Sequence, residues 1–152
     1  LLGACNQKSY RGEPAMRLEG LGSQGNANNI KFEIKSRKTK NGTIIDTSQA
    51  ILDIWDLLYR EKKNPEDIAA KFQIELGKVY ARIAIEAARF HNIRKIGFTG
   101  GVAYNYSISQ TIKTEVKEAG FIFLEHNTIP PGDAGISTGQ LIGGIFQYRK
   151  RS

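Results

Sequence analysis

Residues 96–105 read Ile96-Gly97-Phe98-Thr99-Gly100-Gly101-Val102-Ala103-Tyr104-Asn105. The apolar run 93–98 is typical of a buried strand, and it ends in two glycines followed by a segment that can begin a helix. Paired glycines let a ligand approach the backbone, and the free amides of a first helical turn favour an anion. We therefore expect a strand, a sharp turn and a helix N-terminus. A nucleotide is the natural ligand for such a turn, although a tight connection without any ligand has the same pattern.

The composition is that of one globular domain. The chain has 152 residues, of which 40% are hydrophobic and 24% charged, so a buried core can form and disorder is not indicated. No run of about 18 apolar residues and no N-terminal targeting pattern occurs, and we expect a cytoplasmic protein that does not enter a membrane. Because the chain begins at Leu1 without methionine, we expect a single domain excised from a larger protein.

Cysteine and histidine offer little chemistry. Cys5 is the only cysteine, which excludes a disulfide or a cysteine-based zinc cluster within the chain. We expect it to be a small buried residue rather than a nucleophile. His91 and His126 lie far apart in the sequence and form no metal-binding pair, so we expect a helix-end residue and a loop residue.

The net charge of +7 and a pI near 9.6 leave the class of partner open. The basic residues are concentrated in 35–40 and 149–151, which we expect to be a solvated loop and tail. These segments could contact RNA, an acidic protein or an anionic substrate.

The first third of the chain predicts a helix and a hairpin. Gly12-Glu13-Pro14 opens a helix that extends to about residue 21, with proline in its first turn. Residues 30–35 alternate apolar and polar side chains, as a half-buried strand does. Asn41-Gly42 is a strong hairpin signal, so we expect residues 43–45 to pair back against that strand.

Two helices should follow. Residues 46–48 offer N-caps for the first, whose apolar face we expect to comprise Ile51, Ile54, Trp55 and Leu58. Asp53 and Asp56 on its other side are a solvated face or, alternatively, a catalytic carboxylate pair. Residues 64–67 combine an N-cap, proline and acids, and they begin a helix that should reach Phe90. Its apolar stripe, which we expect to be core, comprises Ile68, Phe72, Leu76, Val79, Ile83 and Ala87.

A second strand and turn are predicted after residue 105. A helix over 103–119, with Gly120 as its C-terminal stop, leads to a buried strand at 121–124. The helical crossover predicts that this strand lies parallel to 93–98. An extended loop at 129–132 then precedes a last helix with three glycines four residues apart, a smooth face that favours close packing: Gly135, Gly139 and Gly143.

The two strand-to-helix turns should face one cleft, because ligands gather beyond the carboxyl ends of parallel strands. Asn105 beside the first turn can contact a base or ribose through its amide, or can cap the helix. Asp133 at the second turn is a helix cap or an oxygen ligand for a metal. The residues alone do not choose between these roles.

Three separated motifs carry a family resemblance. Residues 10–16 with Leu18-Glu19, residues 99–105 and residues 129–140 together resemble the C-terminal part of the Kae1-like module of HypF, the carbamoyltransferase family of hydrogenase maturation. The module is also similar to TsaD, the tRNA threonylcarbamoyl transferase. The resemblance covers essentially the whole chain and implies the α/β C-terminal lobe of an actin-like, Hsp70-like ATPase (ASKHA, ribonuclease H-like), a mixed sheet with helices packed on it.

The resemblance also implies an activity. In HypF, carbamoyl phosphate and ATP with Mg give carbamoyl-adenylate, and the carbamoyl group passes to the C-terminal cysteine of the partner protein HypE. The family's metal-binding histidines and phosphate-binding glycine segment lie upstream of the part found here. We therefore expect one wall of the site in this chain, which should be inactive alone and contribute no catalytic side chain.

The family's site residues carry over by position. Gly100, Gly101 and Asn105 match residues that approach the nucleotide, and Gly12 with Glu13 matches the loop that closes over it.

Asp133 matches an acid that binds a divalent metal, Zn or Fe, together with histidines outside this chain. The sequence departs from TsaD where Glu13 replaces a glycine and Arg17 replaces an acid, for which Glu19 could compensate.

Two other functions remain open. A TsaD-like tRNA modifier is favoured by the basic charge, whereas residues 130–137 resemble HypF more closely. A non-catalytic lobe that binds nucleotide or docks a partner would use the same glycine turns as architecture.

Overall fold

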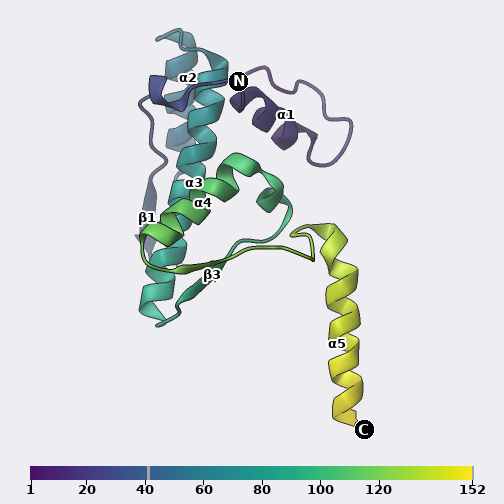
Figure 1. Cartoon of the computed structure of the whole chain (residues 1–152). Coiled ribbons are helices and arrows are strands. Elements are labelled where there is room, and N and C mark those ends of the chain that lie inside the picture. The colour runs from purple at the N-terminus through teal and green to yellow at the C-terminus, as the bar shows by residue number, and fades with distance from the viewer. Residues whose placement is uncertain (41, 152) are drawn as a thin grey trace.

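The computed structural model describes residues 1–40 and 42–151. Shorter helices and short strands lie along a long central helix, and the last helix projects away from the body (Figure 1). The order of elements is α1 (Glu13–Gly22), a 3₁₀ turn η1 (Ala27–Asn29), β1 (Ser36–Thr39), β2 (Gly42–Ile45), α2 (Thr47–Tyr59), α3 (Pro65–Phe90), β3 (Lys95–Gly97), η2 (Gly101–Tyr104), α4 (Tyr106–Glu118), β4 (Ile122–Leu124), η3 (Asp133–Gly135) and α5 (Ile136–Arg151).

Helix α3 is the 26-residue element against which α1, α2 and α4 pack. It begins as predicted, because the Asn64 side chain accepts a hydrogen bond from the Glu66 amide at 3.3 Å and Pro65 occupies the first turn. Glycines mark the closest approaches to α3. A Cβ on Gly22 of α1 would meet the Gln73 side chain, and a Cβ on Gly77 would lie 2.8 Å from Thr111 Cβ of α4.

The predicted stripe of α3 is only part of its buried surface. Ile68 and Val79 are buried as expected, but Ala87 is exposed, whereas Ile85 and Ala88 are buried against α4 and β3. A single stripe is the pattern of a helix lying on one surface. Helix α3 is covered on more than one side, so its buried positions extend beyond one stripe.

The predicted hairpin is present, but its ladder lies further along the chain. Strand β1 pairs antiparallel with β2 in the register Ser36↔Ile45 to Thr39↔Gly42. Residues 30–35 are not part of that ladder and form no strand. Their alternation is confirmed, since Ile30 and Ile34 are buried and Phe32 is partly buried against the core, whereas the residues at 31, 33 and 35 are exposed. The predicted turn residue Asn41 lies outside the described residues.

The predicted parallel pair is confirmed. Strand β3 pairs with β4 in the register Lys95↔Ile122 to Gly97↔Leu124, and α4 forms the crossover between them. Ile108, Ile112 and Val116 of α4 are buried in the core beside this pair, as predicted. The α/β class is therefore confirmed, with the strands divided between two two-stranded sheets, one antiparallel and one parallel.

The buried face of α2 was mispredicted. The predicted N-cap is confirmed, because the Asp46 side chain accepts a hydrogen bond from the Gln49 amide at 3.1 Å. Ile54 is buried and Leu58 partly buried, but Ile51 and Trp55 are exposed by 53% and 42%. Apolar side chains lie around most of α2, so the spacing of apolar residues could not show which face is buried. The buried face also includes Ala50 and Leu57. The acids of α2 are partly exposed: Asp53 accepts a hydrogen bond from Gln49, and Asp56 pairs with Arg60.

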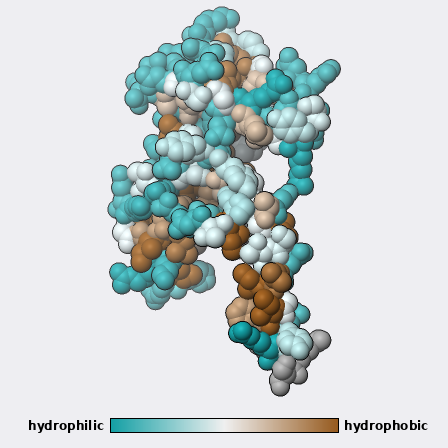
Figure 2. Space-filling model, turned by 45° about the vertical axis from the view of Figure 1, so that its right-hand side comes forward, coloured by the Kyte–Doolittle hydropathy of each residue, from teal (hydrophilic) through white to brown (hydrophobic). Residues whose placement is uncertain are grey.

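Helix α5 differs from the prediction of close packing. It extends away from the body (Figure 1), and a Cβ on Gly139 or Gly143 would meet nothing within 4 Å. Only Gly135, in the η3 turn before the helix, is closely packed, since a Cβ there would meet the Pro130 carbonyl. Its large side chains are exposed, including Leu141 at 65% and Phe146 at 61%, and they form the brown surface of the projecting helix in Figure 2. Across the described residues, no helix has the length and apolar character needed to span a membrane.

Candidate functional site

The first predicted turn requires glycine. Strand β3 ends at Gly97, and Gly100 then adopts φ +100° and ψ 177° before η2 begins at Gly101. This region of backbone space is essentially restricted to glycine, since a Cβ would be strained there. An added Cβ at Gly100 or Gly101 would meet no atom within 4 Å, so the open side of this turn is accessible to a ligand.

The second predicted turn lies directly against the first. The Gly100 amide donates a hydrogen bond to the Pro131 carbonyl at 2.8 Å, and the Thr99 hydroxyl donates to the same oxygen at 3.1 Å. The Tyr104 ring lies over Gly132 so closely that a Cβ there would meet it. Sequence reasoning placed both turns at one edge and missed Tyr104, whose only signal was its place inside the first motif.

Asn105 is the N-cap of α4. Its Oδ1 accepts a hydrogen bond from the Ile108 amide at 2.9 Å, while its Nδ2 donates to Gln73 Oε1 at 2.7 Å. The capping role, one of two considered from the sequence, is therefore present. One N–H of the amide remains for a ligand, and nucleotide binding by Asn105 stays a prediction.

Gln73 is a buried polar residue that sequence reasoning missed. Its side chain is 2% exposed, and its Nε2 donates to the carbonyls of Leu18 in α1 and Ala69 in α3, at 3.3 and 3.1 Å. Its Oε1 accepts from Asn105. The available signal was a polar residue next to the apolar stripe of α3, but the same pattern is expected of a solvated side chain.

Helix α1 also reaches α4 directly. Glu19 Oε1 accepts a hydrogen bond from the Tyr106 amide at 2.7 Å, at the first residue of α4. A carboxylate at a helix N-terminus is favoured by the helix dipole and by the unpaired amides of the first turn. Of the acids in α1, Glu19 is thus the one that lies beside the candidate site.

Gly12 and Glu13 lie at the start of α1, away from Glu19. Gly12 has φ +91° and precedes the helix, and Glu13 is six residues before Glu19, roughly 9 Å along a helix axis. The buried Glu13 carboxylate accepts from the Ser9 amide and hydroxyl at 2.6 and 2.7 Å and from Arg17 Nε at 2.8 Å. The Ser9 hydrogen bonds, with Arg17, lower the pKa of Glu13 from 4.5 to about 2. Glu13 therefore stabilises the start of α1, and its predicted nucleotide contact stays a prediction.

Asp133 is the first residue of η3, and its side chain is exposed. A carboxylate suits a divalent cation, yet one carboxylate is an incomplete ligand set. Within the residues that the structure describes, no three His, Cys, Asp or Glu side chains come together to hold a metal. Asp133 can therefore supply one oxygen ligand, and the remaining ligands would have to come from outside these residues.

Cys5 and the histidines have local contacts. Cys5 Sγ, partly buried, donates to the Gln7 carbonyl at 3.2 Å. His126 Nδ1 lies 2.9 Å from the Ile129 carbonyl in the loop before η3, and His91 is the C-cap of α3. The histidines thus lie in a loop and at a helix end, as predicted.

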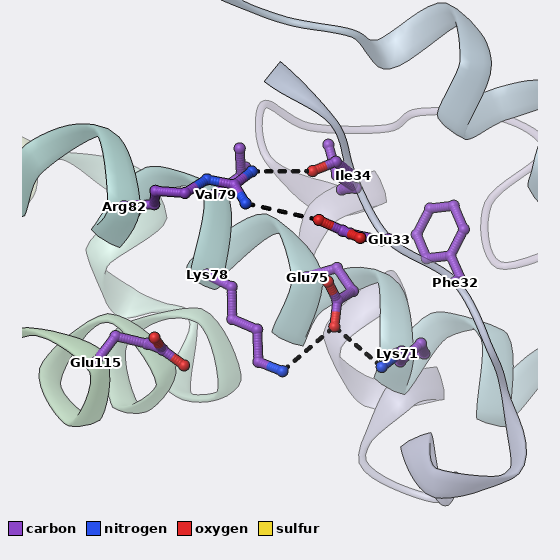
Figure 3. A pocket seen from close by; sticks show the side chains of 9 residues that line it. All are labelled: Phe32, Glu33, Ile34, Lys71, Glu75, Lys78, Val79, Arg82 and Glu115. Carbon is purple, nitrogen blue, oxygen red and sulfur yellow. Dashed lines mark hydrogen bonds and ion pairs between the residues drawn. The ribbon is translucent and has the colours of Figure 1, made fainter. Parts of the chain in front are cut away.

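Two surface pockets lie away from the predicted site residues. The first, of about 390 Å³, lies between residues 32–34, α3 and Glu115 of α4. Its cations already have partners (Figure 3): Glu75 binds Lys71 and Lys78 at 2.9 and 3.4 Å, and Arg82 Nη1 lies 3.6 Å from a Glu33 oxygen.

The second pocket, of about 470 Å³, is formed where α3 and α4 end and includes Arg89 and Arg94. Neither pocket includes a predicted nucleotide or metal ligand.

The geometry agrees with a family comparison. Residues 1–140 match the family described as "Carbamoyltransferase, Kae1-like Domain, second subdomain". The chain belongs to this carbamoyltransferase family. Its α/β fold is accordingly the lobe of an actin-like ATPase that the motifs predicted.

Relatives include both enzymes named from the motifs. A probable carbamoyltransferase HypF of Methanocaldococcus jannaschii is 35% identical over 147 residues, which are 97% of this chain and 18% of that protein. A tRNA N6-adenosine threonylcarbamoyltransferase of Clostridium botulinum is 29% identical over 93% of this chain and 42% of that protein.

Solved structures of HypF proteins have a fold similar to that of this chain. The crystal structure of T. kodakarensis HypF has a TM-score of 0.81 and 32% identity, covering 96% of this chain and 18% of that one. A full-length HypF in a phosphate- and nucleotide-bound form has a TM-score of 0.80 at 23% identity over 91% of this chain and 18% of that one, a likeness of fold. The chain thus spans less than a fifth of the length of the HypF proteins that it matches.

Proposed function

We propose that this chain is the C-terminal half of the Kae1-like module in a HypF-type hydrogenase maturation enzyme. The full enzyme would use carbamoyl phosphate and ATP to form carbamoyl-adenylate and would transfer the carbamoyl group to the C-terminal cysteine of HypE. The present chain would supply one wall of the nucleotide and metal site and would be inactive alone.

The contact between the two turns carries this proposal. The Gly100 amide and the Pro131 carbonyl are 2.8 Å apart, and this contact brings the Gly100-Gly101 backbone and Asp133 to one edge beyond the parallel strands. That edge is where ligands bind in sheets of this kind. Two independent motifs of one carbamoyltransferase family therefore meet at a place suited to a phosphate-bearing ligand.

The residues of this chain would orient the adenylate. The backbone at Gly100 and Gly101 would lie along the phosphate, and the remaining N–H of Asn105 Nδ2 would donate to the ribose or base. In the transfer step the HypE thiolate sulfur attacks the carbamoyl carbon, the C–S bond forms, and the C–O bond to AMP breaks, so that AMP leaves with the electron pair. The nucleophile comes from the partner.

A divalent metal would be held in part by Asp133, with histidines from outside this chain. When bound, such a metal would neutralise phosphate charge next to the acyl carbon. Asp133 would serve only as one oxygen ligand.

The test is ATP binding by calorimetry, with a divalent metal, on the full-length protein. Asn105→Ala should weaken ATP binding, and Asp133→Ala should reduce the bound metal measured by elemental analysis. Asp53→Ala is a matched control, because Asp53 is a partly exposed acid of α2 whose side chain accepts a hydrogen bond from Gln49 of the same helix. Losses in both site variants would justify an assay of carbamoyl transfer to HypE. Unchanged ATP and metal binding in both would mean that the turns are architecture and would favour a partner-docking lobe.

A tRNA threonylcarbamoyl transferase is the second candidate. It is supported by the net charge of +7 and by the 29% identity to the C. botulinum enzyme over 93% of the chain. Basic residues that bind phosphates make affinity fall steeply with salt. Tight tRNA binding that weakens steeply as salt is raised, without transfer to HypE, would favour this candidate.

A further inference from the structure

Gln73 connects the two segments predicted to bind nucleotide. One end of its amide contacts Leu18 of α1, the helix that begins at the Gly12 loop, and the other contacts Asn105 beside the glycine turn. These residues are 55 and 32 positions from Gln73 in the sequence. A 2% exposed side chain with contacts at both ends fixes the distance between the elements that it joins.

We propose that Gln73 is a positioning residue, which holds the Asn105 amide in the orientation needed for the nucleotide and couples that orientation to the docking of α1. The proposal rests on the proposed nucleotide site. It assigns Gln73 no contact with substrate, because the side chain is buried between α1, α3 and Asn105.

Only one orientation of the Gln73 amide satisfies its neighbours. Nε2 points at two carbonyl oxygens, Leu18 O and Ala69 O, so Oε1 must be the atom that accepts from Asn105 Nδ2. The orientation of Asn105 follows, because its Nδ2 faces Gln73 and its Oδ1 caps the Ile108 amide. A flipped Asn105 would place its oxygen against Gln73 Oε1 and would lose the cap. The side chain is therefore fixed before any ligand binds.

The same contacts hold α1 in place. Gly22 lies so close to Gln73 Nε2 that a Cβ would meet it, and that Cβ would be 3.0 Å from the Ala70 nitrogen. Glu19 adds the separate hydrogen bond to the Tyr106 amide at 2.7 Å. Displacement of α1 would remove the Leu18 carbonyl from Gln73, and the restraint on Asn105 would weaken with it.

The first test needs no ligand. Hydrogen exchange of the full-length protein is followed by mass spectrometry in wild type, Gln73→Met, Asn105→Ala and the double variant. Asn105→Ala removes the cap and should speed exchange of the Ile108 amide about fivefold. Gln73→Met leaves the cap in place but frees the Asn105 side chain, so exchange should also speed, by up to about fivefold, with no further change in the double variant relative to Asn105→Ala. Amides of residues 112–116, deeper in α4, are the internal reference. Unchanged exchange at Ile108 in Gln73→Met would overturn the proposal.

The second test measures ATP affinity by calorimetry in the same variants. Gln73→Met should weaken ATP binding roughly tenfold, and it should have no added effect when Asn105 is already alanine. Gln110→Met, on the exposed side of α4, is the matched control and should bind as wild type. Independent, additive losses would overturn the positioning role.

The ATP affinities of Asn105→Ala and Gln73→Met show whether a failure concerns the nucleotide site or only the positioning role of Gln73. If wild type binds no ATP, or Asn105→Ala leaves ATP affinity unchanged, the nucleotide site itself is refuted, and with it the role of Gln73 in that site. If Asn105→Ala weakens ATP binding but Gln73→Met does not, the site stands and the positioning role is refuted.

Discussion

Gly77→Ala tests the packing of α3 on α4. The new Cβ would lie 2.8 Å from Thr111 Cβ, 3.0 Å from Thr111 Cγ2 and 3.1 Å from the Ile108 carbonyl. Carbon atoms in contact prefer about 3.5–4.0 Å, so the helices must separate by roughly 0.5–1 Å. Overpacking of this kind costs about 1–3 kcal/mol, and the better helix propensity of alanine returns up to about 1 kcal/mol. The gain offsets part of this cost, so we expect a net loss of up to about 2 kcal/mol.

The assay is urea denaturation of the 152-residue chain, followed by far-ultraviolet circular dichroism. Gly20→Ala is the matched control, because Gly20 is also helical and a Cβ there would meet no atom within 4 Å. That variant should gain up to about 1 kcal/mol. The two substitutions should thus shift the midpoint in opposite directions. A higher midpoint for Gly77→Ala, equal to that of Gly20→Ala, would show that the two helices are not in close contact.

Three further predictions concern stability. Backbone hydrogen bonds are the largest cause that lowers the pKa values of Glu13 and Asp67, so both carboxylates stabilise the fold above their unfolded pKa values. The Glu13 contribution should be lost as pH falls from about 4.5 toward 2, and the Asp67 contribution as pH falls below 3.8, its ordinary pKa; urea midpoints should therefore decrease less on acidification in Glu13→Gln with Asp67→Asn than in wild type. Ile34→Ala should cost about 2–5 kcal/mol and Ile44→Ala far less, since their exposures are 1% and 44%; equal losses in urea denaturation would refute that burial. Asp46→Ala should cost about 1 kcal/mol of unfolding free energy, and an unchanged melting curve would contradict the cap.

The sequence predicted where helices begin more accurately than it predicted which residues pack against one another. Asn64-Pro65 and Asp46 begin their helices where predicted, because capping depends on a few adjacent residues. The prediction of the buried face of α2 was wrong. Apolar side chains lie on several sides of this helix, and its packing on α3 determines which of them are buried. Residues 30–35 are a second example. The predicted alternation of buried and exposed side chains was correct, but the predicted strand pairing was not, because pairing depends on a partner strand.

The candidate site was likewise predicted only in part. Gly100 and Asp133 were placed at one edge from the strand order, since parallel strands end together. Gln73 could not be predicted, because its role depends on Leu18 and Asn105, which are distant in sequence. A polar residue on a helix flank is usually solvated, and only the arrangement of α1 and α4 shows that this one is enclosed.

The docking of α1 has a consequence for the order of folding. Its hydrogen bonds join residues that are 55 positions apart, between Leu18 and Gln73, and 87 apart, between Glu19 and Tyr106. Contacts that close such long loops form late, whereas the β1–β2 hairpin and the α3–α4 pair involve shorter separations. Synthesis proceeds from the N-terminus, so α1 leaves the ribosome before any of its partners. Helix α1 is therefore synthesised before α3 and α4, yet its contacts with them should form after α3 and α4 have packed on each other.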